Sequence, residues 1–211
     1  MKTVMKTFAS LALAAILLAG CAKTPDEIKL GGVGPVTGEA ATFGDSTKKG
    51  LQLAVEEWNA KGGVLGKQIK LVFADDKGDP AEGATVYTKL IQQDKVVAIV
   101  GTVMSKVTLA GAPIAQAAKI PMISPTSTNE KVTQVGDYIY RACFIDPFQG
   151  TVGAKFAFND LGAKVAGVIF DVGNDYSKGL AENFKKSFEA LGGQRSEERR
   201  VGKECRSRWS P

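Results

Sequence analysis

The sequence contains no histidine and only three cysteines. Without histidine, Ser-His-Asp and Cys-His catalytic groups cannot form, and the usual zinc sites lose a common ligand. Cys143 is the only cysteine within residues 22–194, so no disulfide framework is expected there and packing is its expected role. These absences disfavour an exported hydrolase, and we expect neither a metal nor another cofactor.

Arginine is nearly absent until the end of the chain. Residues 1–194 contain one arginine, Arg141, whereas residues 195–211 read RSEERRVGKECRSRWSP. So abrupt a change in composition is not typical of one domain, and the string resembles the translation of a short sequencing adapter. We therefore interpret residues 195–211 as a non-native tail. The alternative is a basic tail that binds nucleic acid, since clustered arginines bind phosphates.

The formal net charge of +5 comes from the two ends of the sequence. In residues 22–194, lysine plus arginine and aspartate plus glutamate number 19 each. A neutral segment of this kind gives no reason to expect an anionic partner, so we expect no nucleic-acid partner.

Long apolar runs are also scarce, and the one from Phe8 to Leu18 is too short to span a bilayer. It follows two lysines and leads to Leu-Ala-Gly-Cys at residues 18–21, which resembles a bacterial lipoprotein signal. We expect residues 1–20 to be a signal peptide and residues 21–27 to be a lipidated Cys21 with a tether. The alternative is an ordinary secretory signal with an incidental cysteine. Either signal predicts a protein outside the cytoplasm, and the lipoprotein signal also predicts anchoring to the membrane.

Strand and helix patterns alternate along the rest of the chain, which predicts an α/β fold with mainly parallel sheets. A change of rhythm near Ile145 predicts two Rossmann-like lobes, residues 28–145 and an incomplete second lobe at residues 146–194. The predicted strands are residues 28–33, 68–75, 96–100, 121–123, 138–142 and 164–170. The predicted helices are residues 46–60, 146–161 and 177–191, with two more that begin near Pro80 and Thr108. The first of these helices is expected to bury Leu51, Ala54, Val55 and Trp58.

Hydroxyl groups follow two neighbouring predicted strands. Ser105 lies in the loop after the strand that ends at Val100, and Thr128 lies in the loop after the next strand. In a parallel βαβ unit both loops lie at the carboxyl edge of the sheet, where open α/β sheets bind ligands. We therefore expect Ser105 and Thr128 to face one crevice.

Other polar motifs in the sequence do not indicate a nucleotide or catalytic site. The glycines near residue 32 have the wrong spacing for a dinucleotide loop, and the Gly66-Lys67 pair lacks the following Ser or Thr of a phosphate loop. The acid pairs Asp75/Asp76 and Glu56/Glu57 are interpreted as solvated surface, because neighbouring side chains point apart.

Several longer stretches together resemble a known family. They are GLQLAVEEWNAKGGVLGKQIKLVFADDKGDP at residues 50–80, AIVGTVMSKVT at residues 98–108 and KIPMISPTSTN at residues 119–129. The chain resembles the extracytoplasmic binding proteins of branched-chain amino-acid ABC transporters, which have the type I periplasmic-binding fold. The similarity covers residues 29–194, but the chain stops about halfway through the family's length.

The resemblance implies roles for five residues. Ser105 and Thr128 match the hydroxyl groups that hold the ligand carboxylate, and Ser127 matches the residue whose backbone carbonyl receives the ammonium. Phe43 and Tyr176 match aromatic positions that wall the side-chain pocket. The alternatives are a plain helix cap for Ser105 and a turn residue for Thr128, and isolated aromatic side chains such as Phe43 and Tyr176 are more often part of the core.

The expected function follows from this resemblance. It implies a solute-binding lipoprotein, not an enzyme, that binds an amino acid between two lobes and delivers it to an ABC permease. The implied ligand is a branched-chain or other aliphatic amino acid, and we expect a monomer. The alternative is the ligand-sensing domain of an extracytoplasmic receptor or regulator on the same fold.

Overall fold

A computed structural model describes residues 27–201, with side chains as far as Gln194. The predicted signal peptide, Cys21 and residues 202–211 of the predicted tail lie outside the described residues. Within the described part, no helix has the length and apolar character needed to cross a membrane.

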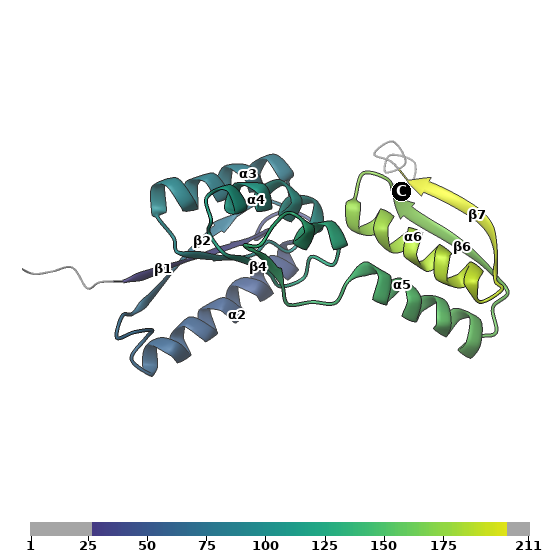
Figure 1. Cartoon of the computed structure of the whole chain (residues 1–211), viewed down its shortest axis with the longest axis horizontal. Helices are drawn as coiled ribbons and strands as arrows, with labels where there is room; N and C mark the ends of the chain where they lie inside the picture. The colour runs from purple at the N-terminus through teal and green to yellow at the C-terminus, as the bar shows by residue number, and fades with distance from the viewer. Residues whose placement is uncertain (1–26, 202–211) are drawn as a thin grey trace, which may run out of the picture.

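The first half of the chain forms a five-stranded parallel sheet in the order β2-β1-β3-β4-β5 (Figure 1). Its strands are β1 (Ile28–Gly34), β2 (Ile69–Asp75), β3 (Ala98–Val100), β4 (Met122–Ser124) and β5 (Ile139–Arg141). Each connection between consecutive strands crosses over through a helix or a long loop, as parallel pairing requires. The strand order reverses between β1 and β3, so the connections that follow these two paired strands run in opposite directions at the carboxyl edge of the sheet, where such sheets bind ligands. The predicted α/β fold with parallel sheets is confirmed.

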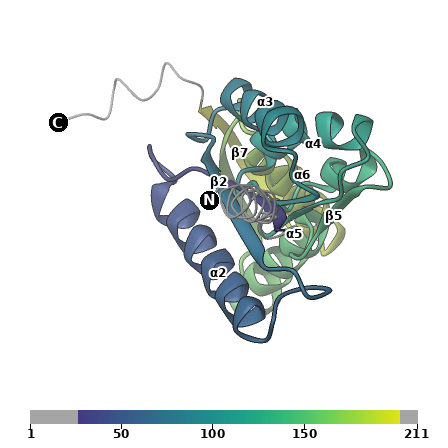
Figure 2. The same ribbon diagram turned by 90° about the vertical axis from the view of Figure 1, so that its left-hand side faces the viewer.

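Helices cover both faces of this sheet, as Figures 1 and 2 show. On one side lies α2 (Ala41–Ala60), and on the other lie α3 (Pro80–Lys89) and α4 (Ser105–Ala117). Two short turns, η1 (Leu90–Asp94) and η2 (Glu130–Gln134), complete the layer. The Asp79 side chain caps α3 by accepting hydrogen bonds from the backbone N–H groups of Ala81 and Glu82, as the sequence predicted. We call β1–β5 with these helices lobe one.

The chain leaves lobe one over residues 142–145 and builds a second group of elements, which we call lobe two. It consists of α5 (Asp146–Lys155), η3 (Phe156–Asp160), β6 (Val165–Asp171), α6 (Asp175–Ala190) and β7 (Gln194–Val201). The sequence predicted only one strand here, whereas β7 pairs in parallel with β6, with one shift of register between Ala166 and Gly167. Strand pairing uses backbone groups, which almost any sequence offers. The interpretation of residues 195–211 as non-native therefore stays a prediction.

The start of α2 was predicted wrongly. The sequence pattern predicted a helix over residues 46–60, but the helix already begins at Ala41. Gly44, in its first turn, serves close packing, because a Cβ at this position would lie 1.9 Å from the Pro35 carbonyl oxygen. Phe43 consequently stands on the first turn of a helix.

The predicted buried stripe of α2 was also only partly right. Leu51 and Val55 are half-buried, but Ala54 is exposed and 55 % of the Trp58 surface is accessible. The helix lies against β1 and β2 at the edge of the sheet, so only one narrow face can be covered. The spacing of apolar residues predicts which face of a helix packs against the sheet, but it does not predict how much of that face the sheet covers.

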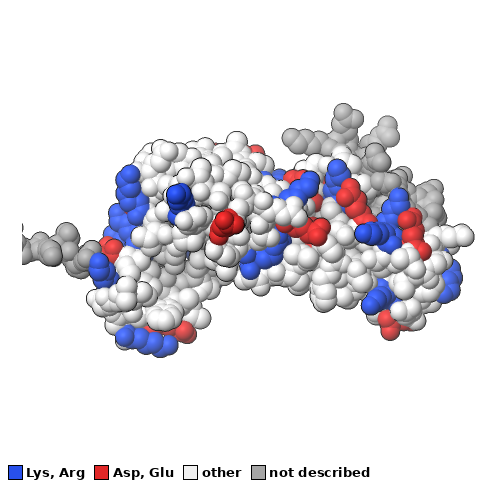
Figure 3. Space-filling model, viewed as in Figure 1, with Lys and Arg blue, Asp and Glu red and all other residues white. Residues whose placement is uncertain are grey.

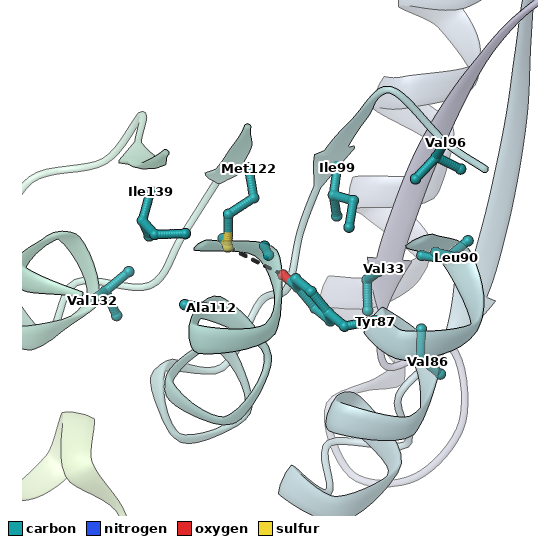
Figure 4. Close-up of a cluster of buried hydrophobic side chains, with 11 residues drawn as sticks. Val33, Val86, Tyr87, Leu90, Val96, Ile99, Ala112, Met122, Val132 and Ile139 are labelled. Carbon is teal, nitrogen blue, oxygen red and sulfur yellow. Dashed lines mark hydrogen bonds between the residues drawn. The ribbon is translucent and has the colours of Figure 1, made fainter. Parts of the chain in front are cut away.

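The core of lobe one surrounds Tyr87, whose side chain is fully buried (Figure 4). Its ring packs with Leu90, Val33 and Ile99 from three elements. The hydroxyl group donates a hydrogen bond of 2.9 Å to the Gly101 carbonyl and lies 3.5 Å from the Met122 sulfur. This bond fixes the end of β3, where the candidate ligand loop begins.

We expect Tyr87→Phe to lower the free energy of unfolding by about 1 to 2 kcal/mol, because the buried Gly101 carbonyl loses a hydrogen-bond donor. Urea denaturation measures this change. Tyr140→Phe removes a hydroxyl from an exposed side chain and serves as the control. Equal effects of the two changes would contradict the assigned role of the Tyr87 hydroxyl.

Candidate functional site

A pocket of about 370 Å³ lies between the two lobes, at the carboxyl ends of β3 and β4. We call it the cleft pocket. Its lining residues are Ala40, Phe43, Val103, Met104, Ser105, Thr126, Thr128, Phe144, Gln149, Asn174 and Tyr176. The structure therefore brings Ser105, Thr128, Phe43 and Tyr176 together, although they are spread over more than half of the described chain.

Ser105 is the first residue of α4, and only 3 % of its surface is exposed. The first backbone N–H groups of this 13-residue helix have no partner within the helix. Together with the positive end of the helix dipole they favour a negative group at this point. The Ser105 hydroxyl adds one directed donor beside them.

Thr128 lies in the loop after β4 and is 6 % exposed. Its backbone carbonyl accepts a hydrogen bond of 3.0 Å from the Asp146 N–H. Its hydroxyl oxygen, by contrast, has no hydrogen-bond partner among the described residues. A buried hydroxyl without a partner is costly, which makes Thr128 the clearest candidate for a contact with a ligand.

Ser127 does not line the cleft pocket. Its hydroxyl lies 2.7 Å from that of Thr108, and its carbonyl accepts a hydrogen bond of 3.0 Å from the Arg141 guanidinium. Thr126 lines the pocket instead and donates a hydrogen bond of 2.9 Å to the Val103 carbonyl. The role of the Ser127 carbonyl stays a prediction.

Three aromatic side chains form the apolar wall of the pocket. Phe43 comes from α2 and is 64 % exposed, and Tyr176 comes from α6, where its hydroxyl accepts a hydrogen bond of 3.2 Å from Gln149. Phe144, in the connection between the lobes, is the third, and the sequence analysis missed it. It follows the carboxyl end of β5, so the rule that singled out Ser105 and Thr128 could have found it.

A buried carboxylate supports the loop beneath the pocket. Asp76 is completely buried, and it accepts hydrogen bonds from the Gly78 N–H at 2.8 Å and from the Thr102 hydroxyl. The assignment of Asp76 to the solvated surface was therefore wrong. The chain turns sharply after β2, so Asp76 points toward the loop after β3 while Asp75 remains at the surface.

Burial raises the pKa of two carboxyl groups near the site. For Asp76, the hydrogen bonds from Thr102 and Gly78 oppose this effect without cancelling it. For Asp146, the charge of Arg141 and the nearby Thr128 hydroxyl act against burial, although neither carboxylate oxygen has a partner in hydrogen-bond geometry. In the described residues, no group of acidic or cysteine side chains is arranged to hold a metal ion.

Charged groups do not mark the site. In Figure 3, basic and acidic side chains are intermixed over the visible face of the molecule. None of the residues that line the cleft pocket is charged, so the pocket offers hydroxyl groups, a helix end and aromatic rings.

The comparisons with known proteins agree with this geometry. A family model described as periplasmic binding protein matches residues 27–202. The Leu/Ile/Val-binding protein BraC3 of Rhizobium johnstonii is 35% identical over 184 residues, which cover 85% of this chain and 50% of that protein. The chain spans about half the length of the curated relatives it matches.

Solved structures give the same result. The leucine binding protein LivK of Thermotoga maritima is 44% identical with a TM-score of 0.76, over 83% of this chain and 48% of that one. LivJ of Streptococcus pneumoniae, in complex with isoleucine, is 37% identical with a TM-score of 0.79, over 84% and 50%. A solute binding protein of Rhodopseudomonas palustris, in complex with 3,4-dihydroxy benzoic acid, is 28% identical with a TM-score of 0.77, over 84% and 48%.

The buried Asp76 carboxyl should give stability a measurable dependence on pH. Because its pKa is raised in the folded state, its contribution is present below the ordinary value of 3.8 and is lost as the pH rises through the raised value. The free energy of unfolding of the wild type, minus that of Asp76→Asn, should therefore fall as the pH is raised from 3.8 toward neutral.

Urea denaturation of both proteins across this range tests the prediction. Asp137→Asn, at an exposed position, controls for the removal of one negative charge. A difference that rises with pH would contradict the assignment.

Proposed function

This chain belongs to the periplasmic binding protein family, and we propose that it serves an ABC importer as an extracytoplasmic receptor for an amino acid, most suitably a branched-chain one. The observation that carries the proposal is that Thr128, whose buried hydroxyl has no hydrogen-bond partner among the described residues, lines one pocket with Ser105, the first residue of α4. Two hydroxyl donors and a helix end are suited to an α-carboxylate.

The other end of the ligand would meet an apolar wall. Phe43, Phe144 and Tyr176 approach the pocket from α2, from the connection between the lobes and from α6, so both lobes would close on the ligand side chain. Such a wall suits an aliphatic or aromatic group and offers no charged partner to a polar one. A Leu/Ile/Val-binding relative and a neighbour solved with isoleucine support the aliphatic choice.

An aromatic carboxylic acid is the second candidate ligand. The three aromatic rings favour it, and one neighbour was solved with 3,4-dihydroxy benzoic acid. The two ligand classes share the carboxylate and differ in the ammonium group. Titration with isoleucine and with benzoate separates them.

We also propose that Cys21 carries lipid and that the receptor delivers its ligand to a membrane permease. The Leu-Ala-Gly-Cys sequence after an apolar core supports lipidation, and the family of solute-binding proteins supports the permease. A tethered receptor stays close to the permease, which raises its effective concentration there.

Ser105→Ala and Thr128→Ala should each weaken the binding of isoleucine by the complete gene product. Each change removes one hydrogen bond to a charged carboxylate, a loss of roughly 1.5 to 3 kcal/mol. This corresponds to about tenfold to a hundredfold in affinity. Isothermal titration calorimetry measures the change.

Lys106→Ala serves as the control, because this side chain is next to Ser105 in sequence but does not line the pocket. A larger loss for Lys106→Ala than for Ser105→Ala would overturn the assignment of the carboxylate site.

Cys21→Ser should move the protein from the membrane fraction to the soluble extracytoplasmic fraction, since one thioether-linked lipid group would be lost. Fractionation followed by immunoblotting measures the distribution. Cys143→Ser should leave it unchanged. If Cys21→Ser has no effect, the leader is an ordinary secretory signal.

A further inference from the structure

Arg141 occupies the last position of β5, immediately before the chain passes to lobe two. It pairs in register with Ser124, the last residue of β4. The loop that follows β4 and bears Thr128 therefore passes beside the Arg141 side chain. No carboxylate in the described part of the chain lies within ion-pair distance of this guanidinium.

The guanidinium group donates four hydrogen bonds into residues 127–133. Nη1 donates to the carbonyls of Ser127 at 3.0 Å and Asn129 at 2.8 Å. Nη2 donates to the Glu130 carbonyl at 3.0 Å and to the Thr133 hydroxyl at 2.8 Å. All four terminal N–H groups of one planar side chain are thus used on a single turn.

These bonds hold the two residues that flank Thr128. The carbonyls before and after Thr128 are held by Arg141, and the carbonyl of Thr128 itself accepts from the Asp146 N–H. Every backbone carbonyl from residue 127 to residue 130 is consequently satisfied. Thr128 lines the cleft pocket, and its hydroxyl oxygen is buried near the Asp146 carboxylate without a hydrogen-bond partner among the described residues.

We propose that Arg141 is a positioning residue for ligand binding, which fixes the loop at residues 127–130 so that Thr128 is held at the cleft pocket before the ligand arrives. The inference rests on the proposed function, because it assumes that Thr128 contacts the ligand. Holding the hydroxyl in place in advance lowers the entropy lost on binding. Lysine could not replace arginine fully, since an ammonium group has three N–H donors and lacks the planar fork.

A double-mutant cycle tests this role with isoleucine as the probe and the complete gene product as the protein. Arg141→Gln should weaken binding about tenfold, because the Thr128 hydroxyl is no longer held in place. In the Thr128→Ala background the same change should cost less than about twofold, since no hydroxyl remains to be positioned. In the Phe43→Ala background it should again cost about tenfold, because Phe43 lines the pocket from α2 and no hydrogen bond among the described residues joins it to residues 127–130.

Hydrogen exchange in the absence of ligand supplies a second measurement. Arg141→Gln should speed the exchange of the backbone amides at residues 127–133 and leave those of β3 unchanged. Lys131→Gln is the matched control, because it removes one positive charge from the same turn at an exposed position. If Arg141→Gln does not fold, Arg141→Lys replaces it, with a smaller loss of affinity that again depends on Thr128.

Equal losses in the Thr128→Ala and Phe43→Ala backgrounds would overturn the inference, since they would indicate a general effect on the fold. Unchanged affinity in Arg141→Gln would overturn it as well. In both cases the carboxylate site would stand if Ser105→Ala and Thr128→Ala weaken binding. If neither of those two changes weakens binding, the proposed function fails, and the positioning role fails with it.

Discussion

One backbone carbonyl, that of Thr102, links the elements that make the site. It accepts hydrogen bonds from the hydroxyl groups of Ser124 at 2.8 Å, Ser127 at 3.2 Å and Thr108 at 3.3 Å. These residues come from the end of β4, the loop after it and the first turn of α4, while the Thr102 hydroxyl reaches Asp76 at the end of β2. A polar group that is buried away from water needs a hydrogen-bond partner. The hydrogen bonds among these groups therefore fix the conformation of the loops.

The sequence predicted the features that depend on local pattern. The alternation of strand and helix patterns predicted the parallel sheet. The rule that ligands bind at the carboxyl ends of neighbouring strands predicted that Ser105 and Thr128 line one pocket. It could not predict that Asp76 turns inward, because burial of that carboxylate depends on Thr102, which is distant along the chain. The early start of α2 was missed for a related reason, since Gly44 is required by contact with Pro35 and not by a turn.

The short connection between the lobes places three residues at or near the site. Phe144 lies within it, Arg141 precedes it and Asp146 follows it, and all three contact the pocket or the loop that bears Thr128. Asn129 on the same loop reaches lobe two, where its side-chain amide donates a hydrogen bond of 2.9 Å to the Asp175 carbonyl. A substitution in this loop is therefore expected to affect contacts in both lobes.

Hydrogen bonding distinguishes the buried polar side chains that only support the structure from those that are available to a ligand. Buried hydroxyl groups with hydrogen-bond partners belong to Ser124, Ser127 and Thr108. Their hydrogen bonds stabilise the loops and leave no unpaired group for a ligand. Thr128 is buried to a similar extent, but its hydroxyl has no partner among the described residues. An unpaired buried hydroxyl destabilises the empty pocket, and a bound carboxylate would remove that cost. The four hydrogen bonds that Arg141 donates to residues 127–133 hold the backbone of this loop, while the Thr128 hydroxyl stays buried without a partner among the described residues.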